Sequence, residues 1–127
     1  MLERELAFTI RDGYPVSPGH TLVIPRRHCE TYFDATPEEQ AALWALVDET
    51  RRELDAVLDP RPDGYNVGFN AGEAAGQTVM HLHIHVIPRY TGDVDNPRGG
   101  VRWVVPEKAD YTAGGADGGD LSSPQST

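Results

Sequence analysis

The residues best suited to chemistry form one short run in which histidines alternate with aliphatic residues. His81, His83 and His85 are separated by Leu82 and Ile84. Successive side chains on a β-strand point to opposite faces, so this spacing places three imidazoles on one side and aliphatic side chains on the other. Burying three half-basic rings without partners would carry a large desolvation cost. The run therefore predicts a strand with one core face and one functional face.

Two kinds of chemistry suit a row of imidazoles. Neutral histidine is a common zinc ligand, and histidine can also attack phosphorus to form a phosphoramidate that water later cleaves. Neighbours on one strand face lie ~6.6 Å apart, and the first and third lie ~13 Å apart, too far to share one ion at bonds of ~2 Å. Zinc would therefore use two of them plus a ligand from elsewhere. We favour covalent catalysis by the middle histidine and expect no metal site.

Several segments have the composition of strands that would position this row. Residues 5–11, 20–25 and 65–70 are rich in β-branched, aromatic and aliphatic residues and are bounded by Gly, Pro, Asp or Asn. Residues 5–11 and 20–25 resemble an antiparallel pair. Residues 101–106 are either a last short strand or an extended arm.

One long helix is indicated between these strands. Thr36 is a predicted N-cap, Pro37 occupies the first helical position and Glu39 completes a capping box. Apolar residues then recur at spacings of three and four through Leu58, which predicts one buried stripe. The Pro- and Gly-containing residues 59–64 cannot continue a helix.

Polar residues flank the histidine run. The glycine-bounded loop 71–76 most simply joins the strand 65–70 to the histidine strand as an antiparallel hairpin. That connection brings Asn70, Gln77 and Thr78 close to the imidazoles. Their amides and hydroxyl are suited to orienting phosphate oxygens, and Gly68 leaves room for a ligand beside the backbone.

Composition narrows the function classes. The 127 residues carry a net charge of −9, which argues against a protein that holds nucleic acid through its phosphates. One cysteine excludes an internal disulfide and fits a reducing compartment, and no apolar window reaches membrane-spanning length. We expect a cytoplasmic single-domain protein that binds neither nucleic acid nor membrane. Its last residues, 112–127, have a disordered composition.

Two segments together resemble the histidine triad (HIT) superfamily of nucleotide hydrolases and transferases. They are residues 76–89, which contain the triad, and residues 18–28, which resemble the family's upstream segment. The resemblance covers about residues 5–111 and implies an HIT domain over 1–111. It implies an α+β HIT-like fold with an antiparallel sheet of about five strands, one long helix at about 37–58, short extra segments, and a homodimer.

The resemblance also assigns roles to individual residues. His83 matches the nucleophile that attacks the α-phosphorus, His85 a residue that holds a phosphate oxygen or assists the leaving group, and His81 a residue that orders the nucleophile's surroundings. His28 matches a fourth catalytic histidine of some branches, and Asp12 a ribose-binding position. The remaining nucleotide-binding positions are implied at His20, near the pocket, and at the phosphate-contacting residues Asn70, Gln77 and Thr78.

The implied activity is hydrolysis of dinucleoside polyphosphates or nucleoside phosphoramidates, with an adenine nucleotide as substrate. The third histidine is retained, whereas the uridylyltransferase branch has glutamine there, so hydrolysis is favoured over transfer. The mechanism requires no cofactor, although a divalent cation could enter with the substrate. A non-catalytic nucleotide-binding regulator, a nucleotidyltransferase or phosphorylase, and a metal-dependent enzyme are the alternatives.

Overall fold

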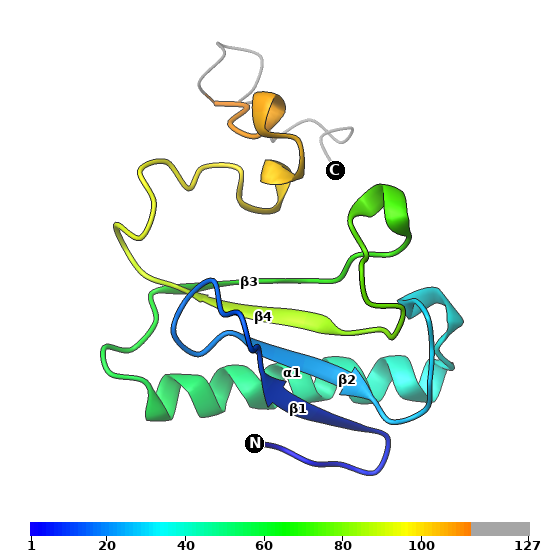
Figure 1. Cartoon of the computed structure of the whole chain (residues 1–127). Helices are drawn as coiled ribbons and strands as arrows, with labels where there is room; N and C mark the ends of the chain where they lie inside the picture. Colours follow the sequence, from blue (N-terminus) through cyan, green and yellow to red (C-terminus); the bar gives the residue numbers. More distant parts are fainter. Residues whose placement is uncertain (113–127) are drawn as a thin grey trace, which may run out of the picture. The chain divides into compact units, whose positions relative to one another are not determined.

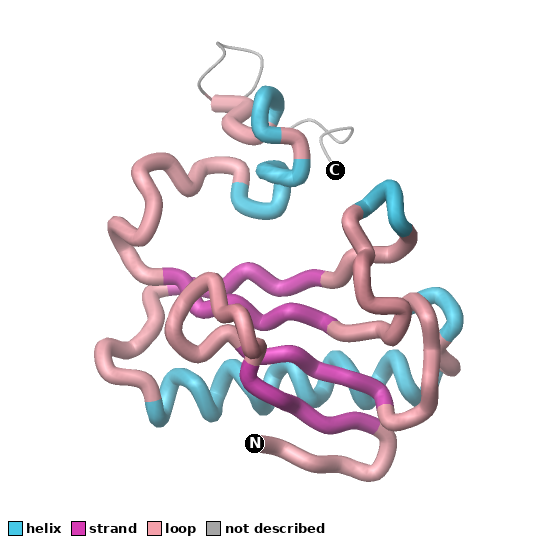
Figure 2. Tube along the Cα trace, in the orientation of Figure 1, coloured by secondary structure: helices cyan, strands magenta, loops and turns pink. Residues whose placement is uncertain are grey.

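The structure is a computed structural model that describes residues 1–112, so the predicted disordered tail lies outside the described residues except for Thr112. The chain divides into two compact units, Met1–Thr91 and a second that begins at Gly92 (Figures 1 and 2). The first unit contains, in chain order, β1 (Ala7–Arg11), β2 (Thr21–Pro25), the 3₁₀ turn η1 (Tyr32–Asp34), α1 (Pro37–Val57), β3 (Gly64–Gly68), the 3₁₀ turn η2 (Glu73–Ala75) and β4 (Ile84–Arg89).

The four strands form one antiparallel sheet in the order β1-β2-β4-β3, and α1 lies along one of its faces (Figure 1). The predicted α+β class and the long helix are confirmed. Thr36 caps α1 through the predicted capping box with Glu39. Leu43, Leu46 and Leu54 of the helix are fully buried, as the spacing of its apolar residues predicts.

The alternation in the histidine run is confirmed, although the strand is shorter than expected. Leu82 and Ile84 are buried in the core, whereas the histidines between and after them are only partly covered. β4 begins at Ile84 rather than at residue 81, because Pro25 ends β2 and has no N–H to continue the ladder. The Leu82 amide instead donates to the carbonyl of Cys29 at 2.7 Å.

Residues 101–106, where a strand or an extended arm was expected, instead form two 3₁₀ helices. They are η3 (Gly100–Val104) and η4 (Pro106–Lys108), within the second unit. Gly99 precedes them with φ of 96°, and a Cβ there would lie 2.1 Å from the Ala109 carbonyl oxygen, so only glycine permits the chain to turn back. The sheet therefore has four strands among residues 1–112, and no helix described there is long and apolar enough to cross a membrane.

An ion pair between the exposed Arg27 guanidinium and the buried Glu39 carboxylate connects the end of β2 to the start of α1. The Arg27 guanidinium donates to both carboxylate oxygens of Glu39 at 2.8 and 2.9 Å. Glu39 is 5% exposed and also accepts from the Thr36 amide. Arg27 first, and then the Thr36 amide, lower the pKa of Glu39 from 4.5 to about 2.

This ion pair predicts that part of the folding stability is lost in acid. Because folding lowers the pKa of Glu39, its stabilising contribution is present above pH 4.5 and is lost as the pH falls toward about 2. We expect Glu39→Gln to lower Tm at neutral pH and to flatten the fall of Tm between about pH 4.5 and 2. Thermal melts across that range test this, with exposed Glu38→Gln as the control that keeps the parent profile. A parent-like slope in Glu39→Gln would contradict it.

Candidate active site

The functional face of the sheet is the one opposite α1. In the strand register His85 lies between Leu22 of β2 and Gly68 of β3. Nothing lies within 4 Å of a Cβ built on Gly68, so the space beside the His85 backbone is open, as the sequence predicted. Asn70 follows two residues after Gly68, at the end of β3 that adjoins the start of β4.

His83 is held with one ring nitrogen free. Its Nδ1 lies 2.9 Å from the carbonyl oxygen of His81. A carbonyl oxygen can only accept a hydrogen bond, so in the neutral ring Nδ1 carries the proton and Nε2 keeps its lone pair. The ring also lies 5.1 Å from that of His85, centroid to centroid. His83 therefore presents an unprotonated, oriented Nε2, the form that a nucleophile needs.

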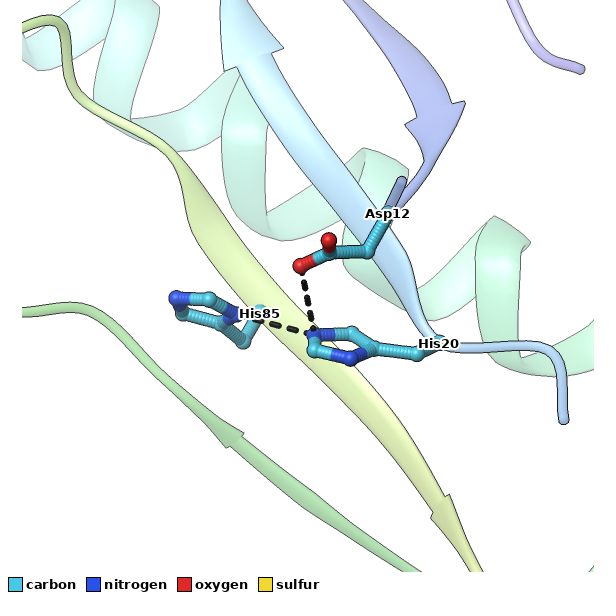
Figure 3. A group of neighbouring side chains, drawn as sticks. All are labelled: Asp12, His20 and His85. Carbon is cyan, nitrogen blue, oxygen red and sulfur yellow. Dashed lines mark hydrogen bonds and ion pairs between the residues drawn. The ribbon is translucent and has the colours of Figure 1, made fainter. Parts of the chain in front are cut away.

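A backbone amide determines the tautomers of the next two histidines. The N–H of Val16 donates to His20 Nδ1 at 3.1 Å, so the proton of a neutral His20 is on Nε2. That Nε2 lies 2.9 Å from His85 Nδ1 and 3.4 Å from an oxygen of Asp12 (Figure 3). His85 Nδ1 is thus an acceptor, and the His85 proton is on Nε2, the nitrogen that points away from His20.

Electrostatics reinforce the neutral form of both rings. Burial lowers the pKa of His20, opposed by the Asp12 carboxylate. Burial also lowers the pKa of His85, with smaller contributions in the same direction from His83 and His20. At neutral pH His85 is therefore an uncharged imidazole that offers one N–H, suited to donating a hydrogen bond to a phosphoryl oxygen.

The same three residues are the group in the described part of the chain that most resembles a metal site. Donor atoms of Asp12, His20 and His85 lie within 4.8 Å of one another. To bind a metal, His20 Nε2 would have to lose its proton, and Nδ1 would then carry one facing the Val16 N–H. The donors as arranged therefore fit a hydrogen-bonded relay better than an ion.

His81 and His28 form a separate pair. His81 Nε2 lies 3.0 Å from the Pro25 carbonyl oxygen, which leaves its Nδ1 to accept from His28 Nδ1 at 3.1 Å. His81 thus anchors the start of the triad to the end of β2. The ring that His28 contacts is that of His81 and not that of His83, so direct participation of His28 in catalysis stays a prediction.

The three residues predicted to contact phosphate differ in how exposed their side chains are. Asn70 and Thr78 are exposed, and their side chains are accessible to a ligand. Gln77 is buried: its amide donates to the carbonyls of Glu30 and Val79 and accepts from Gly72. A phosphate needs hydrogen-bond donors, and both side-chain N–H groups of Gln77 already donate to backbone carbonyls. Gln77 therefore stabilises the connection between β3 and β4 instead. That connection runs from residue 69 to residue 83, longer than the expected loop.

An apolar pocket beside the triad was not recognised from the sequence. Its volume is about 390 Å³. It is lined by Phe8, Ile10, Leu22, Ile24, Pro25, Arg26, Val79, His81, Leu82 and His83. The signal was present in β1 and β2, where apolar residues occupy both faces, so those that point away from α1 require a partner other than the core.

A sequence model of the HIT domain matches residues 1–92, which include the triad and every other residue of this site. The chain belongs to the HIT family. Among its relatives, the AP-4-A phosphorylase of Mycobacterium tuberculosis is 39% identical over 92 residues, covering 72% of this chain and 46% of the relative. The bis(5'-adenosyl)-triphosphatase of Dictyostelium discoideum is 38% identical over 94 residues, covering 72% and 60%.

Solved structures agree with the HIT assignment. A hypothetical histidine triad nucleotide-binding protein of Sulfolobus tokodaii superposes with a TM-score of 0.67 at 40% identity, covering 72% of this chain and 60% of that one. The chain spans less than two thirds of the length of the curated relatives named above. The extension of the HIT domain to residue 111 stays a prediction.

Proposed function

We propose that this HIT protein hydrolyses nucleotides by transferring a nucleotidyl group to His83 and then to water. The observation that carries the proposal is the hydrogen bond from His83 Nδ1 to the His81 carbonyl, which leaves Nε2 unprotonated at the wall of the pocket. The activities named for two relatives, a phosphorylase and a triphosphatase, involve the same class of bond.

In the first step, His83 Nε2 forms a bond to the α-phosphorus while the bond from phosphorus to the leaving group breaks. A polyphosphate leaves as its anion. An amine leaves neutral, because its nitrogen takes a proton from solvent as the phosphorus–nitrogen bond breaks. His85 Nε2–H donates to a phosphoryl oxygen as charge develops there. In the second step water attacks phosphorus, its proton passes to solvent, and neutral His83 is released together with a nucleoside monophosphate.

The apolar pocket is the proposed place for the nucleoside. Phe8, Leu22 and Ile24 provide apolar walls against which a planar base packs, with the triad at one side. Asp12 is the proposed ribose contact, and Asn70 and Thr78 the proposed phosphate contacts. Adenine is the proposed base, and a divalent cation is required only by particular substrates.

Trapping the intermediate tests the proposal. The protein is denatured rapidly, without acid, during turnover of diadenosine tetraphosphate with magnesium or of an adenosine phosphoramidate. Mass spectrometry should then detect an adenylyl group on the peptide that contains His83. With inorganic phosphate present, AMP is expected as the product; ADP would show that phosphate is the acceptor and favour the phosphorylase alternative. Turnover without an adduct on His83 would contradict the proposal.

We also propose that two copies pair through β3. β3 is an edge of the sheet, with β4 as its neighbour, and an unpaired edge can add a strand. Beside it lies an aromatic cluster in which Tyr32 stacks on Phe69 at 4.8 Å, while Phe33 is 73% exposed. Sedimentation equilibrium should report a dimer that Phe33→Asp weakens and that Tyr14→Asp, at a still more exposed aromatic residue of the β1–β2 loop, leaves intact. A monomeric parent would contradict this.

A further inference from the structure

Gln77 is a buried polar residue in the connection between β3 and β4. Its side chain is 3% exposed, whereas the other polar side chains of that connection are half-buried or exposed. The Gly72 N–H donates to Gln77 Oε1 at 2.8 Å. Gln77 Nε2 donates to the carbonyls of Glu30 at 2.6 Å and Val79 at 3.1 Å. One side chain therefore links both parts of the loop to a residue 47 positions earlier in the chain.

The segment that Gln77 contacts also bonds to the start of the triad. The Leu82 N–H donates to the carbonyl of Cys29 at 2.7 Å. That carbonyl immediately precedes the Glu30 carbonyl, which accepts from Gln77. Cys29 is 2% exposed and belongs to the core, so its carbonyl is a fixed acceptor. The hydrogen bonds from Gln77 and Leu82 thus hold the triad's approach against one short stretch of backbone.

The bond to Cys29 orients the carbonyl that holds His83. The C=O of His81 and the N–H of Leu82 belong to one planar trans peptide group, in which they point in opposite directions. With the N–H directed at Cys29, the carbonyl is directed away from Cys29, and it accepts from His83 Nδ1 at 2.9 Å. The bond that leaves His83 Nε2 unprotonated therefore depends on the plane of one peptide.

We propose that Gln77 is a positioning residue for the nucleophile. By linking Glu30 to the loop that precedes the triad, it holds the peptide between His81 and Leu82 in the plane that orients His83. The inference rests on the proposed nucleotidyl transfer to His83 and adds a residue that prepares that step. It gives Gln77 a role other than the phosphate contact that the family resemblance implied, since both of its side-chain N–H groups already donate to carbonyls.

Gln77→Met tests the proposal, because methionine has nearly the same length but cannot donate these hydrogen bonds. With the full chain and diadenosine tetraphosphate plus magnesium, we expect the single-turnover rate of adenylyl transfer to His83 to fall at least about tenfold. The Kd for AMP should change less than about twofold, because AMP binding does not require an oriented nucleophile. A phosphate contact at Gln77 predicts the opposite pattern, in which AMP binding weakens.

Gln40→Met is the matched control. The Gln40 amide also donates to a backbone carbonyl, that of Tyr32 at 3.1 Å, but Gln40 belongs to α1, on the other face of the sheet from the histidines. We expect this variant to keep the parent rate and the parent AMP affinity. Thermal melts establish that each variant is folded at the assay temperature. If Gln77→Met does not fold, Gln77→Asn replaces it, since that amide is one methylene too short to keep every contact.

A spectroscopic measurement distinguishes positioning from a general loss of stability. In the parent, the His83 Nδ1 proton bonds to the His81 carbonyl and should give a downfield NMR signal that is protected from exchange with water. The signal is assigned by its absence in His83→Ala. Gln77→Met should lose this protection, whereas Gln40→Met should keep it.

The outcomes separate this inference from the proposed function. A folded Gln77 variant that transfers the adenylyl group at the parent rate, or that keeps the protected His83 signal, would overturn the positioning role and leave nucleotidyl transfer in place. A loss of AMP affinity as large as the loss of rate would also overturn it. If the parent itself forms no adduct on His83, the proposed function fails, and the NMR signal decides whether Gln77 orients His83.

Discussion

Replacing His83 with alanine should lower kcat for any substrate by at least about 10⁴-fold, because the variant has no nitrogen to attack phosphorus. The fold should survive, since His83 is only partly buried on the face opposite α1 while Leu82 and Ile84 keep the core side intact. Loss of the hydrogen bond to the His81 carbonyl should cost about 1 kcal/mol.

Three measurements check this result together. Steady-state turnover gives the rate loss, a thermal melt confirms folding, and calorimetry with AMP is expected to show retained nucleotide binding in the apolar pocket. A folded His83→Ala variant that turns over at the parent rate would exclude His83 as the nucleophile. A folded parent that binds AMP but shows no turnover of any substrate would favour the nucleotide-binding regulator.

The second large effect concerns His85 and distinguishes two roles that the sequence leaves open. Because the Val16 amide and His20 keep His85 neutral with its proton on Nε2, we expect it to act as a hydrogen-bond donor and not as a proton donor. His85→Ala should lower kcat by about 10²–10³-fold, the usual cost of removing one donor to a developing oxyanion.

Glutamine is the informative replacement, since its amide can donate a hydrogen bond but cannot transfer a proton at neutral pH. We expect His85→Gln to stay within about tenfold of the parent, and its deficit to be the same for leaving groups of different basicity. Single-turnover rates over a series of phosphoramidates measure this. A deficit in His85→Gln as large as in His85→Ala and growing with leaving-group basicity would establish proton transfer by His85 instead.

Much of the fold could be predicted from the sequence because the sequence patterns that indicate it involve residues close together in the chain. Thr36, Pro37 and Glu39 define a helix start through contacts within four residues, and the structure places α1 there. The alternation around His83 needs only the two-residue period of an extended chain. The strand or extended arm expected at residues 101–106 was wrong, because Gly99 turns that segment back toward Ala109, a long-range approach that composition does not show.

The sequence by itself determined which residues could do chemistry: the alternating histidines, their aliphatic core side and the open Gly68 all follow from residue type and spacing. Only the tertiary structure decided which nitrogen of each ring carries the proton, because the groups responsible come from distant segments. Val16 and His20 lie about seventy residues before His85, and His28 lies 53 before His81. It likewise decided that the Gln77 amide bonds to backbone groups of Glu30, Gly72 and Val79, since hydrogen-bond partners are set by packing.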